Sequence, residues 1–348
     1  MHHHPVQATI GWLAVAVSIP LLWRAQYPGS QTSVDPAFFI FFHTTVELSS
    51  IVISGLVFVT GFSAMMSSRK GAVVFLGVAF LGVALLDLLH TMSYVGMPQA
   101  ITPNTPQKSI FFWLCARMLA ALALFAYAFL PTVPDVSNFR KELSVALVCV
   151  CVAVLGAVGL SIPDSLLPLF VIGQGLTPLK LGLEWLVIGI NMVALVLFWK
   201  RRQELANECI LALGFAVALS IVSELFFTML GAADQNFANV VGHFYKLAAY
   251  SFLLHATFNE ALRRPLDRMA IQGIREKQVL SAAPDGILLV NERGEILMVN
   301  PSMEAICGYG QDELLGRNVN IFLPEDLRAR HGDSMRSFFT SSRSRAMG

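Results

Sequence analysis

Eight ionisable side chains of this 348-residue sequence lie inside long apolar stretches, where charge is costly and tends to mark function. Six of them form three pairs, and the spacing of each pair brings both members to one face of a helix. The eight residues are His43 and Glu47 (four apart), Asp87 and His90 (three apart), His243 and Lys246 (three apart), Arg117, and Glu224.

A carboxylate beside an imidazole suits several kinds of site. Histidine nitrogen and carboxylate oxygen bind transition-metal ions, and a carboxylate can instead fix the tautomer of a ligating histidine. The candidate metal ligands are His43, Glu47, Asp87, His90 and His243. The same residues suit a proton relay, a quinone headgroup site, or a b-type haem with histidine ligands on facing helices. The alternative is a self-neutralising salt-bridge network that only holds helices together.

The composition places these residues in a membrane protein. Hydrophobic residues make up 55% of the chain, charged residues only 14%, and the mean hydropathy is +0.63, whereas soluble domains carry roughly 25% charged residues. An ordinary soluble enzyme and a disordered chain are therefore excluded. A net charge of +1 gives no bulk attraction to nucleic acid. The five cysteines show no zinc or disulfide spacing.

Apolar runs of the length that crosses a bilayer, roughly 17–25 residues, recur over the first three quarters of the chain. They predict an all-α membrane bundle of about eight transmembrane helices. The predicted spans are Ala8–Trp23, Ala37–Met66, Gly71–Val95, Ile110–Pro131, Leu143–Ile162, Leu183–Trp199, Cys209–Leu230 and Asn239–Leu262.

The distribution of basic residues between the loops predicts the orientation. One set of alternate loops holds nine Lys and Arg residues: Arg69, Lys70, Arg140, Lys141, Lys200, Arg201, Arg202, Arg263 and Arg264. The other set holds three: Arg24, Lys108 and Lys180. We therefore expect a bacterial inner-membrane protein with both ends of the bundle in the cytoplasm. At ~1.5 Å per helical residue, His43 and Glu47 then lie about 9–15 Å from the outer end of their span, and the other six also fall in the outer half.

Four segments around these residues resemble the third type of membrane-associated sensor domain. They are His43-Thr-Thr-Val-Glu47, Leu86-Asp-Leu-Leu-His90-Thr-Met-Ser-Tyr94, Trp113-Leu-Cys-Ala-Arg117-Met-Leu119 and Gly242-His-Phe-Tyr-Lys246-Leu-Ala-Ala-Tyr250. The resemblance covers roughly residues 10–262. It implies the integral-membrane input of a bacterial histidine kinase or diguanylate cyclase, usually followed by PAS modules, and does not name the signal.

The composition becomes charged after Arg264. Residues 263–278 predict a short cytoplasmic signalling helix with Leu266, Met269, Ile271 and Ile274 at roughly helical intervals, which would pair with a second copy. Residues 279–348 resemble the N-terminal part of a PAS domain, with predicted strands at Ala283–Asn291 and Ile296–Asn300. Because the later strands of a PAS fold are missing, we expect a truncated α/β domain.

His331 follows Arg328-Ala-Arg, and this segment resembles the one that carries the proximal histidine of oxygen-sensing haem PAS kinases. The same local pattern occurs in PAS domains without haem, which favours a solvent-facing helix residue here. The sequence has no kinase phosphoacceptor box, no cyclase Gly-Gly-Asp-Glu-Phe motif and no glycine-rich phosphate loop. We expect no enzymatic activity from this chain.

Three domains are predicted: a membrane-integral sensor (1–262), a linker (263–278) and a truncated PAS domain (279–348). The expected function is a transmembrane sensory input that binds a small molecule, a metal or a quinone in the outer-half cluster. The expected partners are the bilayer and a second copy of the chain. The rival functions are an intramembrane b-type haem electron-transfer protein and a proton or ion transporter. A transporter should show internal repeats and inner-half polar residues, and the inner halves are apolar apart from His255.

Overall fold

The computed structural model describes residues 34–63, 70–99, 101–129, 138–161, 167–171, 175–201, 207–230 and 237–341. The chain divides after Pro265 into two compact units, which are described separately. The predicted first span, Ala8–Trp23, lies outside the described residues.

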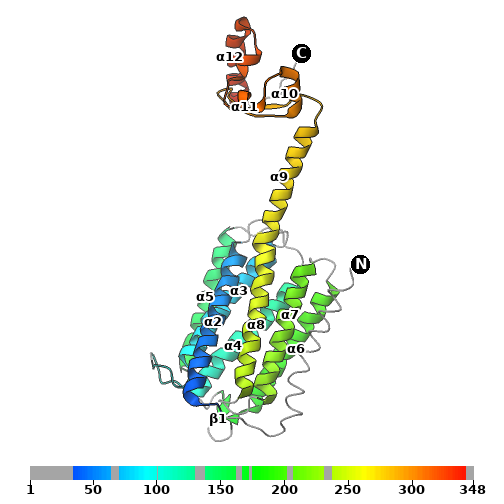
Figure 1. Cartoon of the computed structure of the whole chain (residues 1–348). Coiled ribbons are helices and arrows are strands. Elements are labelled where there is room, and N and C mark those ends of the chain that lie inside the picture. Colours follow the sequence, from blue (N-terminus) through cyan, green and yellow to red (C-terminus); the bar gives the residue numbers. More distant parts are fainter. Residues whose placement is uncertain are drawn as a thin grey trace, which may run out of the picture. The chain divides into compact units, whose positions relative to one another are not determined.

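Long helices make up the first unit (Figure 1). They are α2 (Pro36–Phe62), α3 (Lys70–Met92), α4 (Pro106–Phe129), α5 (Asn138–Ser161), α6 (Pro178–Lys200), α7 (Asn207–Leu225) and α8 (Phe237–Phe258). Two five-residue π-helical segments follow α7 and α8, η1 (Phe226–Leu230) and η2 (Asn259–Arg263). Seven of the eight predicted spans thus coincide with a helix.

Six of the described helices, rather than eight, are long and apolar enough to be candidate membrane spans. They are α2 to α7, in the ranges Pro36–Phe62, Gly71–Met92, Pro106–Phe129, Arg140–Ser161, Pro178–Lys200 and Cys209–Thr228. Helix α8 is long enough, but Asn239, His243, Lys246 and His255 lower its hydropathy. The polar residues that could give α8 a chemical role are therefore the ones that keep its hydropathy below that of the six candidate spans.

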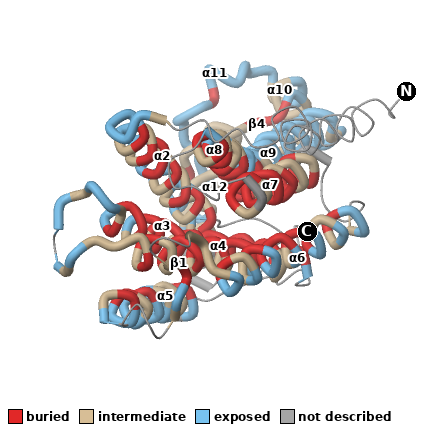
Figure 2. Tube along the Cα trace, turned by 90° about the horizontal axis from the view of Figure 1, so that it is seen from below, coloured by how far each residue is buried: buried red, intermediate tan, exposed pale blue. Residues whose placement is uncertain are grey.

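The bundle packs around a shared interior (Figure 2). Helix α2 packs on α3 and α8, α3 also packs on α4 and α5, and α7 packs between α6 and α8. The outward faces of α2, α5 and α6 carry exposed large apolar side chains such as Phe41, Leu147 and Val193, as a lipid-facing surface requires.

Helices α2 and α3 approach each other closely where Gly61 and Gly77 face each other. A Cβ atom at Gly61 would lie 2.8 Å from the Val73 carbonyl oxygen and 2.9 Å from Gly77 Cα. Small residues at such a crossing allow close packing, the usual basis of helix association within a membrane. This contact fixes α2, which carries His43 and Glu47, against α3, which carries Asp87 and His90.

The segment before α6 forms a short hairpin, β1 (Phe170–Val171) with β2 (Gly175–Leu176). Gln107, at the start of α4, holds it: its side-chain oxygen accepts from the backbone N–H groups of Leu169 (2.9 Å) and Phe170 (3.0 Å). Helix α6 then begins at Pro178, with the Thr177 hydroxyl as N-cap accepting from Lys180 N. Lys180, predicted in an outer loop, is therefore a buried residue of the first helical turn. That prediction was wrong because the N-cap and the Thr-Pro start were not recognised.

The second unit contains α9 (Arg264–Ala282, from Leu266 onward), β3 (Leu288–Val290), β4 (Ile296–Val299), α10 (Pro301–Cys307), α11 (Gln311–Leu314), η3 (Val319–Phe322) and α12 (Glu325–Ser341). Strands β3 and β4 pair antiparallel, with an irregularity between Leu289 and Val290. Ile296, Val299 and Leu314 form the small core. Among residues 266–341 this is the one sheet described.

Candidate ligand-binding site

Two histidines meet at one end of the α2–α3 interface, near the start of α2 and the end of α3. His43 and His90 are both buried, and their Nε2 atoms lie 3.2 Å apart. His90 Nδ1 lies 2.8 Å from the backbone carbonyl oxygen of Ser109, on α4, and 3.1 Å from the Ser109 hydroxyl. A histidine from each of two helices and a carbonyl from a third are thus joined in one line.

Four charged side chains form a buried network one helical turn away. Lys246 Nζ lies 2.5 Å from Glu47 Oε2 and 3.3 Å from Asp87 Oδ2, which ties α8 to α2 and α3. Arg117 Nη2 donates to both oxygens of Asp87 at 2.9 Å, which adds α4. Two carboxylates are thus matched by two permanent cations, so the network is neutral without any protonated histidine. Pairing of this kind is needed because an unpaired charge in a low-dielectric interior is strongly destabilising.

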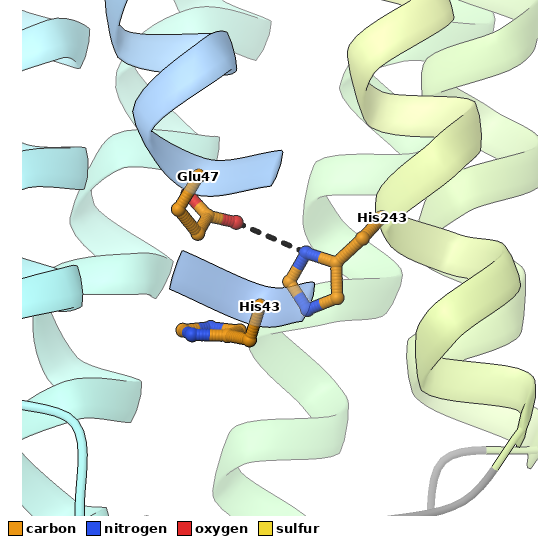
Figure 3. Close-up of side chains that lie close together, drawn as sticks. All are labelled: His43, Glu47 and His243. Carbon is orange, nitrogen blue, oxygen red and sulfur yellow. Dashed lines mark ion pairs between the residues drawn. The ribbon is translucent and has the colours of Figure 1, made fainter. Parts of the chain in front are cut away.

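His243 joins the two groups (Figure 3). Its Nδ1 atom lies 3.0 Å from Glu47 Oε1, and its ring centroid lies 4.9 Å from that of His43. The contact with Glu47 lacks hydrogen-bond geometry, so neither atom has a hydrogen-bond partner among the described residues, and nor has His43 Nδ1. One ligand atom from each of these three residues lies within 4.8 Å of the others.

A small pocket with a cavity volume of about 90 Å³, partly open to the surface, adjoins the three histidines. It lies where α2, α4, α6 and α8 begin and α3 ends, the end predicted to face outward. Its lining is half polar and half aromatic or aliphatic: Phe39, His43, His90, Tyr94, Ser109, Ile110, Trp113, Leu176, Lys180, Phe227, Asn239 and His243. Small-molecule sites commonly combine such apolar walls with a few convergent polar groups.

Seven of the eight predicted residues belong to this assembly of histidines and charges. Glu224, the eighth, is buried on α7, with no ion pair among the described residues. Together with Arg117, Asn191 and Tyr250 it lines a second, smaller cavity. Glu224 therefore lies next to the predicted cluster without being bonded to it. The candidate haem ligand His331 lies in the second unit on α12, half-buried, with Nδ1 3.3 Å from Asn320 Oδ1.

Several residues at the site were not predicted. Lys180 lines the pocket and lies 2.5 Å from Glu184 Oε1, with its ammonium 5.3 Å from the Trp113 ring centroid. The i,i+4 spacing of Lys180 and Glu184 was the signal that could have identified this pair. Tyr94, stacked on His43 at 4.2 Å, and the Ser109 carbonyl have no comparable signal in the sequence.

Comparison with known proteins agrees with this architecture. The family model of the membrane-associated sensor domain MASE3 matches residues 34–265, and that of the PAS fold matches residues 276–346. The oxygen sensor protein DosP of Escherichia coli is 33% identical over 63 residues, which are 18% of this chain and 8% of DosP. The sensor protein FixL of Bradyrhizobium diazoefficiens is 30% identical over 66 residues, 19% of this chain and 13% of FixL.

These matches cover only a small part of either relative, and no solved structure matches the chain. The family models, by contrast, cover both units in the predicted order, and the MASE3 match spans more than half of the residues. The chain is a multi-pass membrane protein of the MASE3 family of membrane-associated sensor domains, in which the sensor domain is followed by a PAS domain.

Proposed function

We propose that the chain is the sensory input of a bacterial signal-transduction protein, and that a ligand entering the outward-facing pocket binds at the three histidines. The protein lies in the inner membrane, with α8 ending at the cytoplasmic face. Basic residues support this orientation. Nine belong to the predicted cytoplasmic set, and three, Arg24, Lys108 and Lys180, belong to the opposite set.

One observation carries the proposal: buried polar atoms that have no hydrogen-bond partner among the described residues lie in or next to the lining of an open pocket. A purely structural network is expected to satisfy its own atoms, as Asp87, Arg117 and Lys246 largely do. His43 Nδ1, His243 Nδ1 and Glu47 Oε1 have no hydrogen-bond partner among the described residues. Leaving such groups unpaired costs about 1–3 kcal/mol each, which a bound ligand would recover.

Helix α8 is suited to carry the signal inward. It holds His243 and Lys246 near its start, and it continues without a break through η2 into α9. The π-helical turns of η1 and η2 are of the kind often found at functional positions. A ligand that favours one arrangement of α2, α3 and α8 shifts these three helices between two states, to an extent set by its difference in affinity for the two states.

The second unit has a direct connection from α9 to the PAS fold. The Asn300 side chain donates to the carbonyls of Leu280 (3.0 Å), in the last turn of α9, and Asp285 (2.9 Å), while its Oδ1 accepts from Ile287 N (2.7 Å). A movement of α9 therefore acts on the strand pair through Asn300. The protein works as a homodimer through the linker and PAS region, and a histidine kinase or diguanylate cyclase is the output.

Among the ligands, the His43–His90 geometry disfavours a b-type haem held by this pair. Two axial nitrogens on opposite sides of one iron are separated by about 4 Å, twice a metal–nitrogen bond of about 2 Å. The observed 3.2 Å is shorter. An absorption spectrum and an elemental analysis of the purified protein test the cofactor directly. A bound haem gives a Soret band in the spectrum, and elemental analysis measures the number of metal ions per chain.

Replacing His43 or His90 with alanine is expected to abolish signalling by the full-length protein in its host, because the ligand loses its binding groups. Membrane levels measured by immunoblot should stay normal. His255→Ala is the matched control, since this exposed α8 histidine bonds only Asn259 (2.9 Å) among the described residues. Loss of the His43→Ala and His90→Ala proteins from the membrane, with signalling intact in whatever remains, would indicate a structural role instead.

A further inference from the structure

We propose that His43, Glu47 and His243 bind one transition-metal dication, through the two Nδ1 atoms and Glu47 Oε1. The inference rests on the proposed sensing site and names its ligand. The three side chains are buried, with exposed fractions of 2%, 0% and 4%. They come from two helices, α2 and α8, so a bound ion would join the helix that receives the signal to the helix that passes it on.

The distances suit an ion. One ligand atom of each residue lies within 4.8 Å of the others, and His243 Nδ1 lies 3.0 Å from Glu47 Oε1. Ligands at about 2.0–2.1 Å from a metal are separated by about 2.9 Å at a right angle and about 3.4 Å in a tetrahedron. The Glu47–His243 separation falls in this range, and neither atom has a hydrogen-bond partner among the described residues.

The tautomer of His43 is set by a chain of contacts that starts at a carbonyl. The Ser109 carbonyl only accepts, so His90 must carry its proton on Nδ1, 2.8 Å away. Neutral His90 then presents a lone pair at Nε2, and the 3.2 Å contact makes His43 Nε2 the donor. Neutral His43 is left with its lone pair on Nδ1, the atom without a partner among the described residues. His90 is thus the positioning residue that turns His43 into a metal ligand, as outer-shell acceptors do in metal sites.

The surrounding charges restrict the ion further. Lys246 occupies Glu47 Oε2 and leaves Oε1 available. Since Glu47 and Asp87 are already balanced by Lys246 and Arg117, a dication adds uncompensated charge, and a hydroxide or another small anion is expected as its fourth ligand. Two imidazoles and one carboxylate select Zn²⁺, Ni²⁺, Cu²⁺ or Fe²⁺ over Mg²⁺ and Ca²⁺, which prefer oxygen. The pocket beside His43 and His243 provides room for the fourth ligand.

The test is a Zn²⁺ titration of the whole chain in lipid nanodiscs, with Co²⁺ as the spectroscopic probe. His2, His3 and His4 are replaced by alanine in every sample, because a run of histidines binds these ions by itself. We expect one equivalent of Zn²⁺ per chain and visible Co²⁺ bands of a four-coordinate site. His43→Ala and His243→Ala should weaken binding at least 100-fold, whereas His255→Ala should bind as the parent does.

Melting temperatures identify variants that fail to fold, and His243→Gln repeats the test with a smaller change of shape. Equal Zn²⁺ affinity in the parent, His43→Ala and His243→Gln would overturn the metal site. If these variants lose signalling although the parent binds neither ion, the metal is excluded and the sensing site remains with an organic ligand. If Zn²⁺ binds as expected but its removal and the variants leave signalling unchanged, the metal site holds and the proposed function fails.

Discussion

Lys246→Met is expected to lower the free energy of unfolding by about 3–5 kcal/mol, the usual cost of leaving a buried charge without its partner. Lys246 is 1% exposed and is shared by Glu47 at 2.5 Å and Asp87 at 3.3 Å. Asp87 keeps both bonds to Arg117, so the cost falls mainly on Glu47. Unfolding by SDS in mixed micelles measures the change.

A double variant separates charge from packing. Adding Glu47→Gln to Lys246→Met removes the unpaired carboxylate, so about half or more of the lost stability should return. Lys108→Met is the matched control on α4: its ammonium bonds only the Thr102 hydroxyl and the Pro103 carbonyl among the described residues, and a change below about 1 kcal/mol is expected. A Lys246→Met protein as stable as the parent would mean that Glu47 is protonated in the native state and that the network is not an ion network.

His90→Ala is expected to weaken Zn²⁺ binding 10–100-fold, the usual effect of removing an outer-shell partner of a ligating histidine. The alanine leaves His43 free to rotate and to place its proton on either nitrogen. Titration of the nanodisc protein measures the affinity, and the Co²⁺ spectrum shows whether the same ligands remain.

Ser109→Ala provides the comparison for His90. It removes the hydroxyl at 3.1 Å from His90 Nδ1 but keeps the backbone carbonyl at 2.8 Å, so the affinity should stay within about threefold of the parent. A large loss in Ser109→Ala would show that the hydroxyl, not the carbonyl, controls the tautomer. An unchanged affinity in His90→Ala would remove His90 from the site altogether.

The sequence was sufficient to predict which residues share one depth in the bundle and which pairs share a helix face, and the reason is geometric. Alternate spans run in opposite directions, so distance along each span translates into depth, and i,i+3 or i,i+4 spacing places pairs on one face. The structure brings His43, Glu47, Asp87, His90, Arg117, His243 and Lys246 together, which a shared depth alone does not ensure because convergence depends on helix packing. Glu224 shares their depth but not their contacts, because depth does not determine which way a helix face is turned.

The sequence could not reveal the parts of the site that depend on packing. The Ser109 carbonyl is a backbone group that any residue at this position would supply, so no residue type marks it in the sequence. The Tyr94 ring stacks on His43 from the turn after α3. Lys180 was misplaced because a lysine after Thr-Pro was interpreted as loop rather than as the first turn of α6. In the second unit, β3 is confined to Leu288–Val290 although the apolar run is longer, since only these residues pair with β4.

The most direct test of the account is hydrogen exchange of the nanodisc-bound chain with and without Zn²⁺, read at the cluster and at residues 259–282. We predict slower exchange around Glu47 and His243 on binding, together with a changed exchange rate through η2 and α9, and neither effect in His243→Ala. Protection at the cluster with no change in residues 259–282 would contradict the account, because the site would then bind its ion without passing anything to the cytoplasmic helix.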